Sequence, residues 1–467
     1  MNSSAGNDTL QHARHAPKRL KKIPVVTPWD PRNLVGFRRD PVAFLAKCVA
    51  RYGDIFKFHI LGIPMIMVNH PDHIEHVLVR RAENYTKKDT LIFDLTEFVL
   101  GNGLIRNPGG PEYARQRKLM QPTFRPNVVG FFTQNMIDES LHLAEMWRPA
   151  AGKDTPVNVT DDVGQIALRI VTRSLFSADV GETAREFELA FADANEVLGS
   201  LFRNPFPPLS LPSRRRTVMR EATARMKRFV QSFVERRVAT NDVRDDLLGM
   251  LMRATYEDDG GHMTVEQLYD EVLNLVIAAF ETTTSGISWA LYLIAKHPEV
   301  GQRFVNEIDT KLQGRIPTYR DLNELTYTRQ IVDETLRLYT PAYQTMRSAS
   351  ESDDLDGYYV PAGANIYLNS YVTHRHPEFW DNPEKFDPER FSPEGMAARP
   401  KHAYFPFGSG PRICIGKYFA LAELQLILAI IAQRYRLEIP PGQGEMVADQ
   451  LITLHPRNGV RLLVRER

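Results

Sequence analysis

The stretch from Thr264 to Lys296 constrains the fold of this chain more than any other feature. Thr264 and Gln267 have the spacing of a capping box, which marks the start of a helix. An apolar pattern of helical period then continues to Lys296, and His297-Pro298 ends it, because the residue before a proline is driven out of the helical conformation. About 32 helical residues form a rod on the order of 48 Å long. A rod of this length crosses a whole domain, so the rest of the chain has to pack around it.

The remainder of the chain favours a mainly α fold with small β-sheets. Apolar residues recur at helical spacing from about residue 125 to about residue 340. Strand-forming residues at 55–60 and 64–68 flank a glycine turn and predict a hairpin. Residues 357–363 and 364–368 predict a second strand–turn–strand unit.

The bulk composition excludes several classes of protein. The net charge is +1, which gives no electrostatic case for nucleic acid or for an anionic membrane surface. No apolar run approaches the roughly 18 residues of a transmembrane anchor, and residues 11–22 are basic and polar, without the apolar core of a signal peptide. The two cysteines lie far apart and form no disulfide framework. We therefore expect a soluble, cytoplasmic protein with one domain, residues 23–467, after a loosely ordered basic arm, residues 1–22.

Cys414 stands in a glycine-rich loop near the end of the chain. Glycines in this loop let the backbone approach a flat ring closely, and Arg412 lies two residues before the cysteine. A thiolate is a soft ligand that suits heme iron. The apolar run that starts at Tyr418 predicts a helix, whose N-terminal N–H groups would stabilise a thiolate. Cys48 lies instead in an amphipathic helical pattern, for which we expect a buried core cysteine.

The middle of the long helix is poor helix-forming material. Residues 278–286 contain three consecutive threonines followed by Ser-Gly. Hydroxyls at such positions can bond carbonyls one turn back and bend the helix. Glu281 and Thr282 place an acid and a hydroxyl at this weak centre, which favours a functional site over packing. The alternative is that Thr282 only hydrogen-bonds within the helix.

Two motifs resemble those of the cytochromes P-450, the heme-thiolate monooxygenases. The pattern Phe-x-x-Gly-x-Arg-x-Cys-x-Gly is matched at every fixed position from Phe407 to Gly416. Residues 278–283 resemble the family's oxygen-binding motif, Ala-Gly-x-(Glu/Asp)-Thr-Thr, except that Ala279 replaces the glycine and would narrow the oxygen groove. The resemblance covers residues 36–467. It implies the family's fold, in which the long helix crosses over the heme and the cysteine loop lies on the opposite face.

The resemblance also implies a cofactor and a reaction. The cofactor would be heme b (iron protoporphyrin IX), with Cys414 as the iron ligand. Glu281 and Thr282 would form the acid–alcohol pair, in which Thr282 holds a water and Glu281 feeds protons inward. The reaction would be a monooxygenation that inserts one atom of dioxygen into a lipophilic small molecule, by hydroxylation or epoxidation.

The two heme propionates need cations or hydrogen-bond donors. The family's positions for these correspond to Arg117, Arg347 and Arg412. Tyr113 stands where the family usually has Trp, and its phenol can still donate one hydrogen bond. The cofactor-binding residues implied by the resemblance are Tyr113, Arg117, Arg347, Phe407, Arg412 and Cys414.

A charge triad is the third constellation. Glu334 and Arg337 place opposite charges three residues apart on one helix face. The family ties such a pair to an arginine like Arg390 downstream. The resemblance therefore implies a buried triad that braces the cysteine loop, because partnered charges can survive burial.

The substrate pocket is implied by the same resemblance. Residues 90–99 correspond to the family's variable loop above the heme, and residues 203–216 to its mobile lid. Most of the side chains concerned are apolar, so we expect a pocket for a lipophilic molecule. The predicted wall residues are Phe93, Phe98, Ala278, Ala279, Tyr343, Gln344, Leu451 and Ile452.

Electrons would come from a separate protein. The chain carries no dinucleotide-binding fingerprint in a strand–helix context. The resemblance implies a ferredoxin or flavodoxin-type partner, fed by an NAD(P)H-dependent reductase. Arg115, Lys118 and Lys417 are candidates for its basic docking face, although a solvated surface position is the alternative for each.

Within the family the chain resembles the fatty-acid and terpenoid oxidising branch. The acid at position 281 is Glu rather than Asp, and Pro388-Glu389-Arg390-Phe391 has the form typical of that branch. We therefore expect a bacterial enzyme of secondary metabolism that oxidises a terpenoid, fatty acid or polyketide. Two alternatives stay open. A heme-thiolate peroxygenase or isomerase would not use reduced dioxygen, and a heme-based sensor or binding protein would need no acid–alcohol pair.

Overall fold

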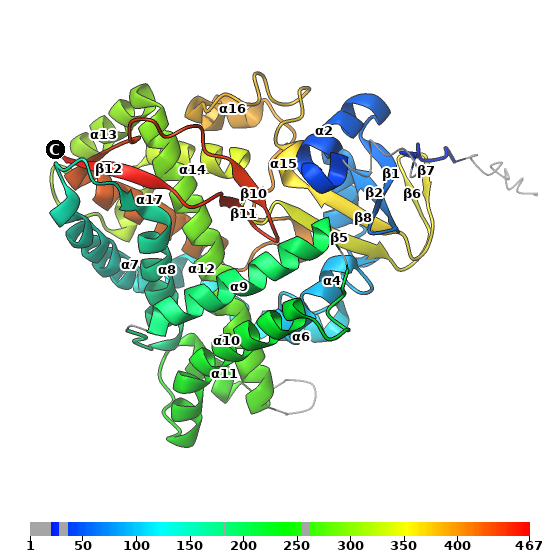
Figure 1. Ribbon diagram of the computed structural model, residues 1–467, viewed down its shortest axis with the longest axis horizontal. Coiled ribbons are helices and arrows are strands. Elements are labelled where there is room, and N and C mark those ends of the chain that lie inside the picture. Colours follow the sequence, from blue (N-terminus) through cyan, green and yellow to red (C-terminus); the bar gives the residue numbers. More distant parts are fainter. Residues whose placement is uncertain (1–19, 28–35, 182, 205, 255–261) are drawn as a thin grey trace, which may run out of the picture.

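The computed structural model describes residues 20–27, 36–181, 183–204, 206–254 and 262–467. Most of the predicted N-terminal arm lies outside the described residues, although Lys21 near its end pairs with Tyr358 in an isolated bridge. Helices dominate the molecule, and the largest sheet is gathered at one side of it (Figure 1). The architecture is mainly α with small sheets, as predicted.

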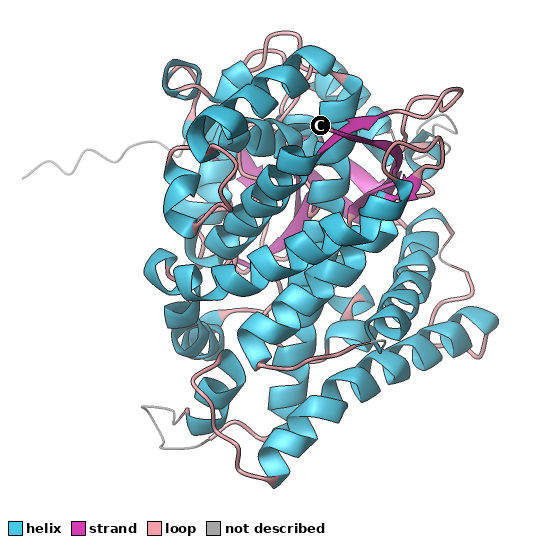
Figure 2. Ribbon diagram, turned by 90° about the vertical axis from the view of Figure 1, so that its left-hand side faces the viewer, coloured by secondary structure: helices cyan, strands magenta, loops and turns pink. Residues whose placement is uncertain are grey.

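Helix α12 (Val265–Lys296) is the central rod of the structure (Figures 1 and 2). It begins at a capping box in which Thr264 accepts from the N–H of Gln267 while the Gln267 side chain accepts from the N–H of Thr264. It ends at Lys296, and the non-helical His297 separates it from the next helix, which starts with Pro298. Its length of 32 residues confirms the predicted rod.

Other helices surround this rod. Those before it are α2 (Pro41–Tyr52), α3 (Pro71–Glu75), α4 (Leu91–Leu95), α5 (Glu97–Leu100), α6 (Gly110–Met120), α7 (Pro126–Trp147), α8 (Val159–Phe176), α9 (Thr183–Arg203), α10 (Arg214–Ala239) and α11 (Leu247–Arg253). Those after it are α13 (Pro298–Leu312), α14 (Thr326–Leu338), α15 (Ser370–Thr373), α16 (Pro393–Ala397) and α17 (Lys417–Arg434). The central rod packs against α8, α10, α14 and α17, which bury it along most of its length.

The largest sheet has the strand order β1-β2-β8-β5-β3. Its strands are β1 (Ile55–Ile60), β2 (Ile63–Val68), β3 (Tyr85–Thr86), β5 (Gln344–Ala349) and β8 (Asn365–Asn369). The predicted hairpin is confirmed, because β1 and β2 pair antiparallel with Lys57 opposite Ile66. Strand β8 then joins β2 in parallel and β5 antiparallel, which brings residues 344–369 beside the N-terminal hairpin.

Smaller sheets complete the fold. They pair β6 (Asp353–Leu355) with β7 (Tyr358–Val360), β10 (Ala448–Gln450) with β11 (Leu454–Pro456), and β12 (Arg461–Glu466) with both β4 (Val157–Asn158) and β9 (Tyr435–Glu438). The second predicted strand–turn–strand unit exists as β7 and β8, but these two strands belong to different sheets.

The β10–β11 hairpin matters for the site because it is anchored on the central rod. The Ser285 hydroxyl of α12 donates to the carbonyl of Leu454 at 2.6 Å, and the N–H of Leu454 donates to the carbonyl of Pro341. The C-terminal hairpin is thereby held against the middle of α12. Across the residues that the structure describes, no helix is long and apolar enough to pass through a membrane.

Candidate active site

The loop before α17 holds Cys414 in a fixed conformation. The N–H of Cys414 donates to the carbonyl of Phe407 at 2.8 Å, which closes the loop. Gly410 has a φ of +67°, and a Cβ there would lie 1.8 Å from the carbonyl oxygen of Leu78. Only glycine therefore lets this loop lie so close to the helical turn His76–Arg80, which contains Leu78. The helix predicted after the cysteine is confirmed as α17, which begins at Lys417.

Cys414 opens into the large cavity of the molecule, which has a volume of about 440 Å³. Burial raises the pKa of its thiol, while the N–H of Gly416 and the charges of Arg117 and Lys417 act in the opposite direction. The N–H group at the start of the helix therefore lowers the pKa of the Cys414 thiol, as predicted, but burial raises this pKa by more. Cys48, in contrast, is a buried core cysteine, as predicted.

Three cations, which we call the cation cluster, line the same cavity: Lys87, Arg347 and Arg412. Within the described residues these cations donate hydrogen bonds only to neutral oxygens. Lys87 donates to the carbonyl of Ile105 at 2.7 Å, and Arg412 donates to the carbonyl of Asn107 at 2.9 Å. Burial, and then the nearby positive charges, hold the pKa of Lys87 well below its ordinary value. The same two causes lower the pKa of Arg347 to about 10.

A thiol sulfur and an uncompensated cation cluster on one cavity fit heme. Iron takes a thiolate ligand, and two propionates would supply the negative charges that the cluster lacks. The cations cannot be explained by packing, because buried like charges without a counter-ion are costly. The described residues that would hold the group are thus Cys414, Lys87, Arg347 and Arg412.

Tyr113 and Arg117 lie beside this cluster but do not line the cavity. The Tyr113 hydroxyl accepts from Arg117 at 2.9 Å and donates to the carbonyl of Pro411 at 3.3 Å. The Arg412 guanidinium stacks over the Tyr113 ring at 4.0 Å. In this structure Tyr113 therefore orients Arg412 and the cysteine loop, whereas the resemblance implied direct contact with the cofactor.

Glu281 and Thr282 both line the cavity, from the middle of α12. The Thr282 hydroxyl donates to the carbonyl of Ala278 at 2.7 Å, which is the intrahelical bond foreseen as an alternative. A hydroxyl that donates there keeps its lone pairs as acceptors, so the bond does not prevent a second role. Glu281 is buried, and its carboxylate is bound by residues from α9 and from the C-terminal hairpin, which are described below.

The cavity wall is mostly apolar. Of the predicted wall residues, Phe93, Ala278, Tyr343, Gln344 and Ile452 line it. Further apolar wall residues, not predicted, include Ile92, Val99, Leu100, Phe191, Leu198 and Ile277.

Three predicted wall residues lie elsewhere. Phe98 is 45% exposed, because α5 turns Val99 and Leu100 inward and leaves Phe98 on its outer face. Ala279 packs against the main hydrophobic core, so its methyl does not narrow the cavity as expected. Leu451 packs against Gly199 of α9, and only its carbonyl reaches the pocket residues Tyr343 and Gln344.

The predicted charge triad comes together in the interior. Arg337 binds both oxygens of Glu334, at 2.6 and 2.8 Å, and Arg390 approaches the same carboxylate at 3.5 Å. The side chains of Glu334 and Arg337 are 0% exposed. Burial raises the pKa of Glu334 against the opposing pull of Arg337.

His374, which the sequence analysis missed, links this triad to the cysteine loop. Arg337 donates to the carbonyl of His374 at 2.9 Å, and the N–H of Phe405 donates to Nε2 of His374 at 3.0 Å. Burial, followed by the charge of Arg337, holds the pKa of His374 well below its ordinary value, so the ring stays a neutral acceptor. The bracing role implied for the triad thus has a physical path to the loop.

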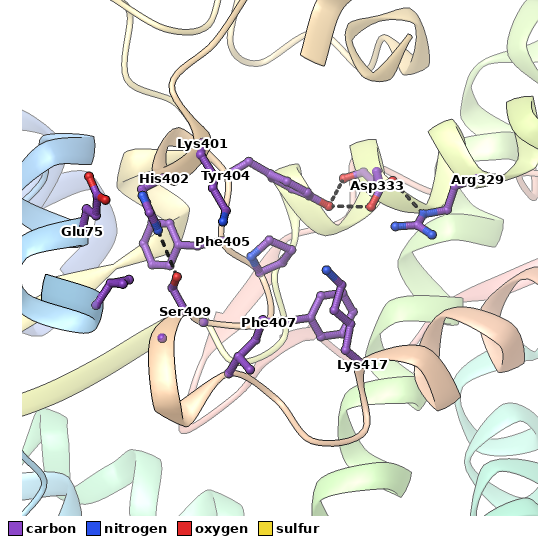
Figure 3. Close-up of a pocket in the computed structure, with 15 residues that line it drawn as sticks. Glu75, Arg329, Asp333, Lys401, His402, Tyr404, Phe405, Phe407, Ser409 and Lys417 are labelled. Atoms are coloured by element: carbon purple, nitrogen blue, oxygen red, sulfur yellow. Dashed lines mark hydrogen bonds and ion pairs between the residues drawn. The ribbon is translucent and has the colours of Figure 1, made fainter. Parts of the chain in front are cut away.

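A second hollow, of about 360 Å³, lies on the other side of the cysteine loop (Figure 3). Residues 405–409 line both this hollow and the large cavity, so the loop forms the wall between them. Lys401, Arg329 and Lys417 bring positive charge to it, and Arg329 pairs with Asp333 at 2.7 Å. Of the three predicted docking residues, Lys417 lines the hollow, whereas Arg115 and Lys118 do not.

Several functional candidates were missed by sequence reasoning. Lys87 follows a two-residue strand and carries no motif. Asn195, Thr453 and His455 surround Glu281, but they lie 86, 172 and 174 positions away from it. Only contacts between distant segments identify such residues, so no local signal could have found them.

Comparison with known proteins gives consistent matches. The family model described as Cytochrome P450 matches residues 26–462. A relative named cyclooctat-9-en-7-ol 5-monooxygenase, from Streptomyces melanosporofaciens, is 32% identical over 410 residues, which cover 86% of this chain and 86% of the relative. A relative named pentalenene oxygenase, from Streptomyces avermitilis, is 31% identical over 423 residues, which cover 90% of this chain and 92% of the relative.

Solved structures agree with these matches. The crystal structure of the cytochrome P450DA heme domain superposes with a TM-score of 0.85 at 25% sequence identity. The superposition covers 96% of this chain and 98% of the other. The arrangement of the long helix, the sheets and the cysteine loop is therefore shared along nearly the whole chain.

Proposed function

Since this chain belongs to the cytochrome P450 family and is a heme-thiolate monooxygenase, we propose that it oxidises a terpenoid at an unactivated carbon. The observation that carries the proposal is that Cys414, Glu281 and Thr282 all line the same mostly apolar cavity. A lipophilic substrate held there lies between the thiol on one wall and the acid and hydroxyl on another. The two Streptomyces relatives support the substrate class, because their names refer to cyclooctat-9-en-7-ol and pentalenene.

Heme b, when bound, supplies the activation of dioxygen. The residues of the chain then have distinct tasks. Cys414 would provide the thiolate, and Lys87, Arg347 and Arg412 would bind the propionates. These cations carry no other counter-ion among the described residues, so propionate binding relieves their mutual repulsion.

Thr282 and Glu281 hold and move protons in the proposed reaction. Thr282 Oγ1 donates to the carbonyl of Ala278 and accepts from a water in the cavity. Glu281 passes a proton to that water, and positioned acids of this kind contribute roughly 10²- to 10⁴-fold to a rate. The apolar wall excludes other water, which keeps protons from reaching the reacting oxygen by uncontrolled routes.

The substrate we propose carries few polar groups. The wall combines aliphatic and aromatic side chains, and most of its polar side chains are already bonded within the protein. Arg106, for example, donates to the carbonyl of Phe93 and to Asn102, and it stacks on the Phe93 ring. Gln344 is bonded to the Tyr367 hydroxyl. A hydrocarbon or lightly oxidised terpenoid therefore fits better than a charged molecule.

We further infer that a ferredoxin-type protein delivers the electrons at the second hollow, beside Lys401 and Lys417 (Figure 3). Small ferredoxins are acidic, and complementary charge speeds their docking. Lys401→Glu should slow reduction and weaken its dependence on ionic strength. Stopped-flow reduction at two salt concentrations measures both effects, and an unchanged rate would place the docking face elsewhere.

Binding titration and turnover together test the proposed function. Purified holoenzyme is titrated with terpenoid hydrocarbons, fatty acids and macrolides, and the spin state of the heme reports displacement of the iron-bound water. We expect terpenoid hydrocarbons to give the largest shift and, under ¹⁸O₂ with a ferredoxin system, products labelled with one ¹⁸O. If fatty acids alone shift the spin state, the terpenoid assignment is wrong. If peroxide supports faster turnover than the ferredoxin system, the protein is a peroxygenase.

A further inference from the structure

Glu281 is held by three donors that all reach the same oxygen. Oε1 accepts from the Thr453 hydroxyl at 2.5 Å and from the Asn195 amide at 3.4 Å, and it also meets Nε2 of His455 in an ion pair. Among the described residues no hydrogen bond reaches the other oxygen, Oε2. The acid is therefore clamped at one end while it lines the cavity.

His455 lies between this buried acid and the protein surface. On the β10–β11 hairpin it stands directly opposite Asp449, which pairs with Arg457 at 2.7 Å. The exposed fraction of the side chain is 4% at Glu281 and 19% at His455. It rises further, to 32% at Asp449 and 52% at Arg457. The exposure of these polar side chains thus increases step by step from the cavity wall to the surface.

The charges that face His455 favour its protonated form. Burial alone would lower the pKa of His455, but the carboxylate of Glu281 from α12 and that of Asp449 from β10 outweigh it, so the pKa is raised. Asn195 from α9 and Thr453 from the hairpin add neutral donors to Glu281. An imidazolium that contacts a carboxylate and lies near the surface can give up a proton and regain one.

We propose, building on the proposed role of Glu281 as the acid of the site, that His455 is the positioning residue through which protons pass from solvent to Glu281. In the transfer the Nε2–H bond of His455 breaks and an Oε1–H bond forms, so that imidazolium and carboxylate become imidazole and carboxylic acid. Glu281 passes its proton into the cavity and becomes a carboxylate again, and the ring regains one proton from solvent water. The charge of the pair is restored after each proton delivered.

Thr453, which also binds Oε1 of Glu281, provides a comparison for His455. Its hydroxyl contacts the same oxygen as His455 but cannot carry a net charge at neutral pH. Removal of the Thr453 hydroxyl should therefore loosen Glu281 without interrupting the supply of protons. Removal of the titrating ring should interrupt that supply even where a hydrogen bond to Oε1 is kept.

The first test needs no turnover. NMR titration of the imidazoles in the ferrous carbonyl form, with the His455 signal assigned by its loss in His455→Gln, gives the pKa of this ring directly. We expect a value above the usual range of about 6.5, and a fall below the wild-type value in Glu281→Gln. A His455 pKa at or below the usual range that Glu281→Gln leaves unchanged would overturn the proposal.

The second test measures product formed per NADPH consumed, and its dependence on pH and on D₂O. His455→Gln keeps an amide donor near Oε1, but the amide does not titrate and cannot pass a proton to Glu281. We expect it to fold and to retain the carbonyl spectrum, to lose about tenfold in product formed per NADPH, and to lose the pH dependence that belongs to His455. Thr453→Val should lose less and keep that step, and His142→Gln, which alters an exposed histidine on α7, should behave as wild type.

The outcomes separate this inference from the proposed function. If Glu281→Gln loses coupling while His455→Gln keeps wild-type coupling and pH dependence, the relay is wrong and the acid role stands. If neither variant loses coupling, the acid role itself has failed. If His455→Gln does not fold, His455→Asn replaces it for the signal assignment, and the NMR titration of wild type and Glu281→Gln still decides the question.

Discussion

Two buried carboxylates, Glu334 and Glu281, meet their basic partners in opposite ways. Glu334 gives both oxygens to Arg337, and both side chains are 0% exposed. Glu281 gives one oxygen to His455 and its neighbours and lies on the wall of the cavity. A guanidinium keeps its charge at every physiological pH, whereas an imidazole titrates near neutrality. The first pair is suited to permanent bracing, and the second is suited to exchanging protons.

Arg337→Met should have the largest effect, because it removes the permanent partner. Glu334 would be left buried without its main cation, which costs about 3–5 kcal/mol in the free energy of unfolding. The carbonyls of His374 and Pro383 would also lose their donor, so the cysteine loop should fail to hold heme. Thermal unfolding and the carbonyl spectrum measure both effects.

The matched control is Arg148→Met. Arg148 belongs to a Glu-x-x-Arg pair with Glu145 at 3.3 Å, but its side chain is 73% exposed. We expect an unchanged melting temperature and full heme content for this variant. If Arg337→Met were as stable as Arg148→Met, the bracing role of the buried pair would be wrong.

Glu281→Gln should show the opposite profile, with a large loss of activity and a small loss of stability. The amide keeps the shape of the side chain but cannot supply a proton, so coupled turnover should fall roughly 100-fold. Product per NADPH and the melting temperature, measured on one preparation, separate the two effects. If Glu281→Gln formed as much product per NADPH as wild type, Glu281 would not supply protons, and it would not differ from Glu334 in function.

Arg390→Met measures how much the third residue of the triad adds to the stability that the Glu334–Arg337 pair provides. Arg390 lies 3.5 Å from Glu334 and is 12% exposed, so its contribution should be smaller than that of Arg337. We expect a loss of about 1 kcal/mol in the free energy of unfolding, typical of one polar contact. A loss as large as that of Arg337→Met would mean that the three residues act as one unit.

The smallest expected effect is a dependence of stability on pH from His455. Its pKa is raised in the folded protein, so its stabilising contribution is fully present below the unfolded value of about 6.5 and is lost as pH rises through the folded pKa. The melting-temperature difference between wild type and His455→Gln should therefore shrink as pH rises from 6 to 9. Parallel curves would show that His455 does not titrate in this range.

Local signals were sufficient for the scaffold. The capping box at Thr264, the stop at Pro298 and the glycine turn between β1 and β2 each depend on neighbouring residues, and each is confirmed. The cysteine loop was also found, because its glycines and Cys414 stand close together in the sequence. Such features are encoded within a few residues, where pattern and conformation are directly linked.

The parts of the site that escaped prediction depend on contacts between distant segments. The identity of His455 as a partner of Glu281 depends on the β10–β11 hairpin being placed over α12, which no local pattern encodes. Phe98 was assigned to the wrong side because the break between α4 and α5 at Thr96 resets the helical face. Lys87 can be recognised as a candidate cofactor-binding residue only from its position near Arg347, which lies far along the chain.

The clamp on Glu281 also has a consequence for the order in which the protein is made. Thr453 follows Glu281 by 172 positions, so at roughly 5–20 residues per second the acid waits on the order of 10–30 s for Thr453 and His455 during synthesis. Until the β10–β11 hairpin emerges from the ribosome, the middle of α12 carries a carboxylate that its own half of the chain cannot neutralise. The contacts of Glu281 with Thr453 and His455 therefore form only after nearly the whole chain has been translated.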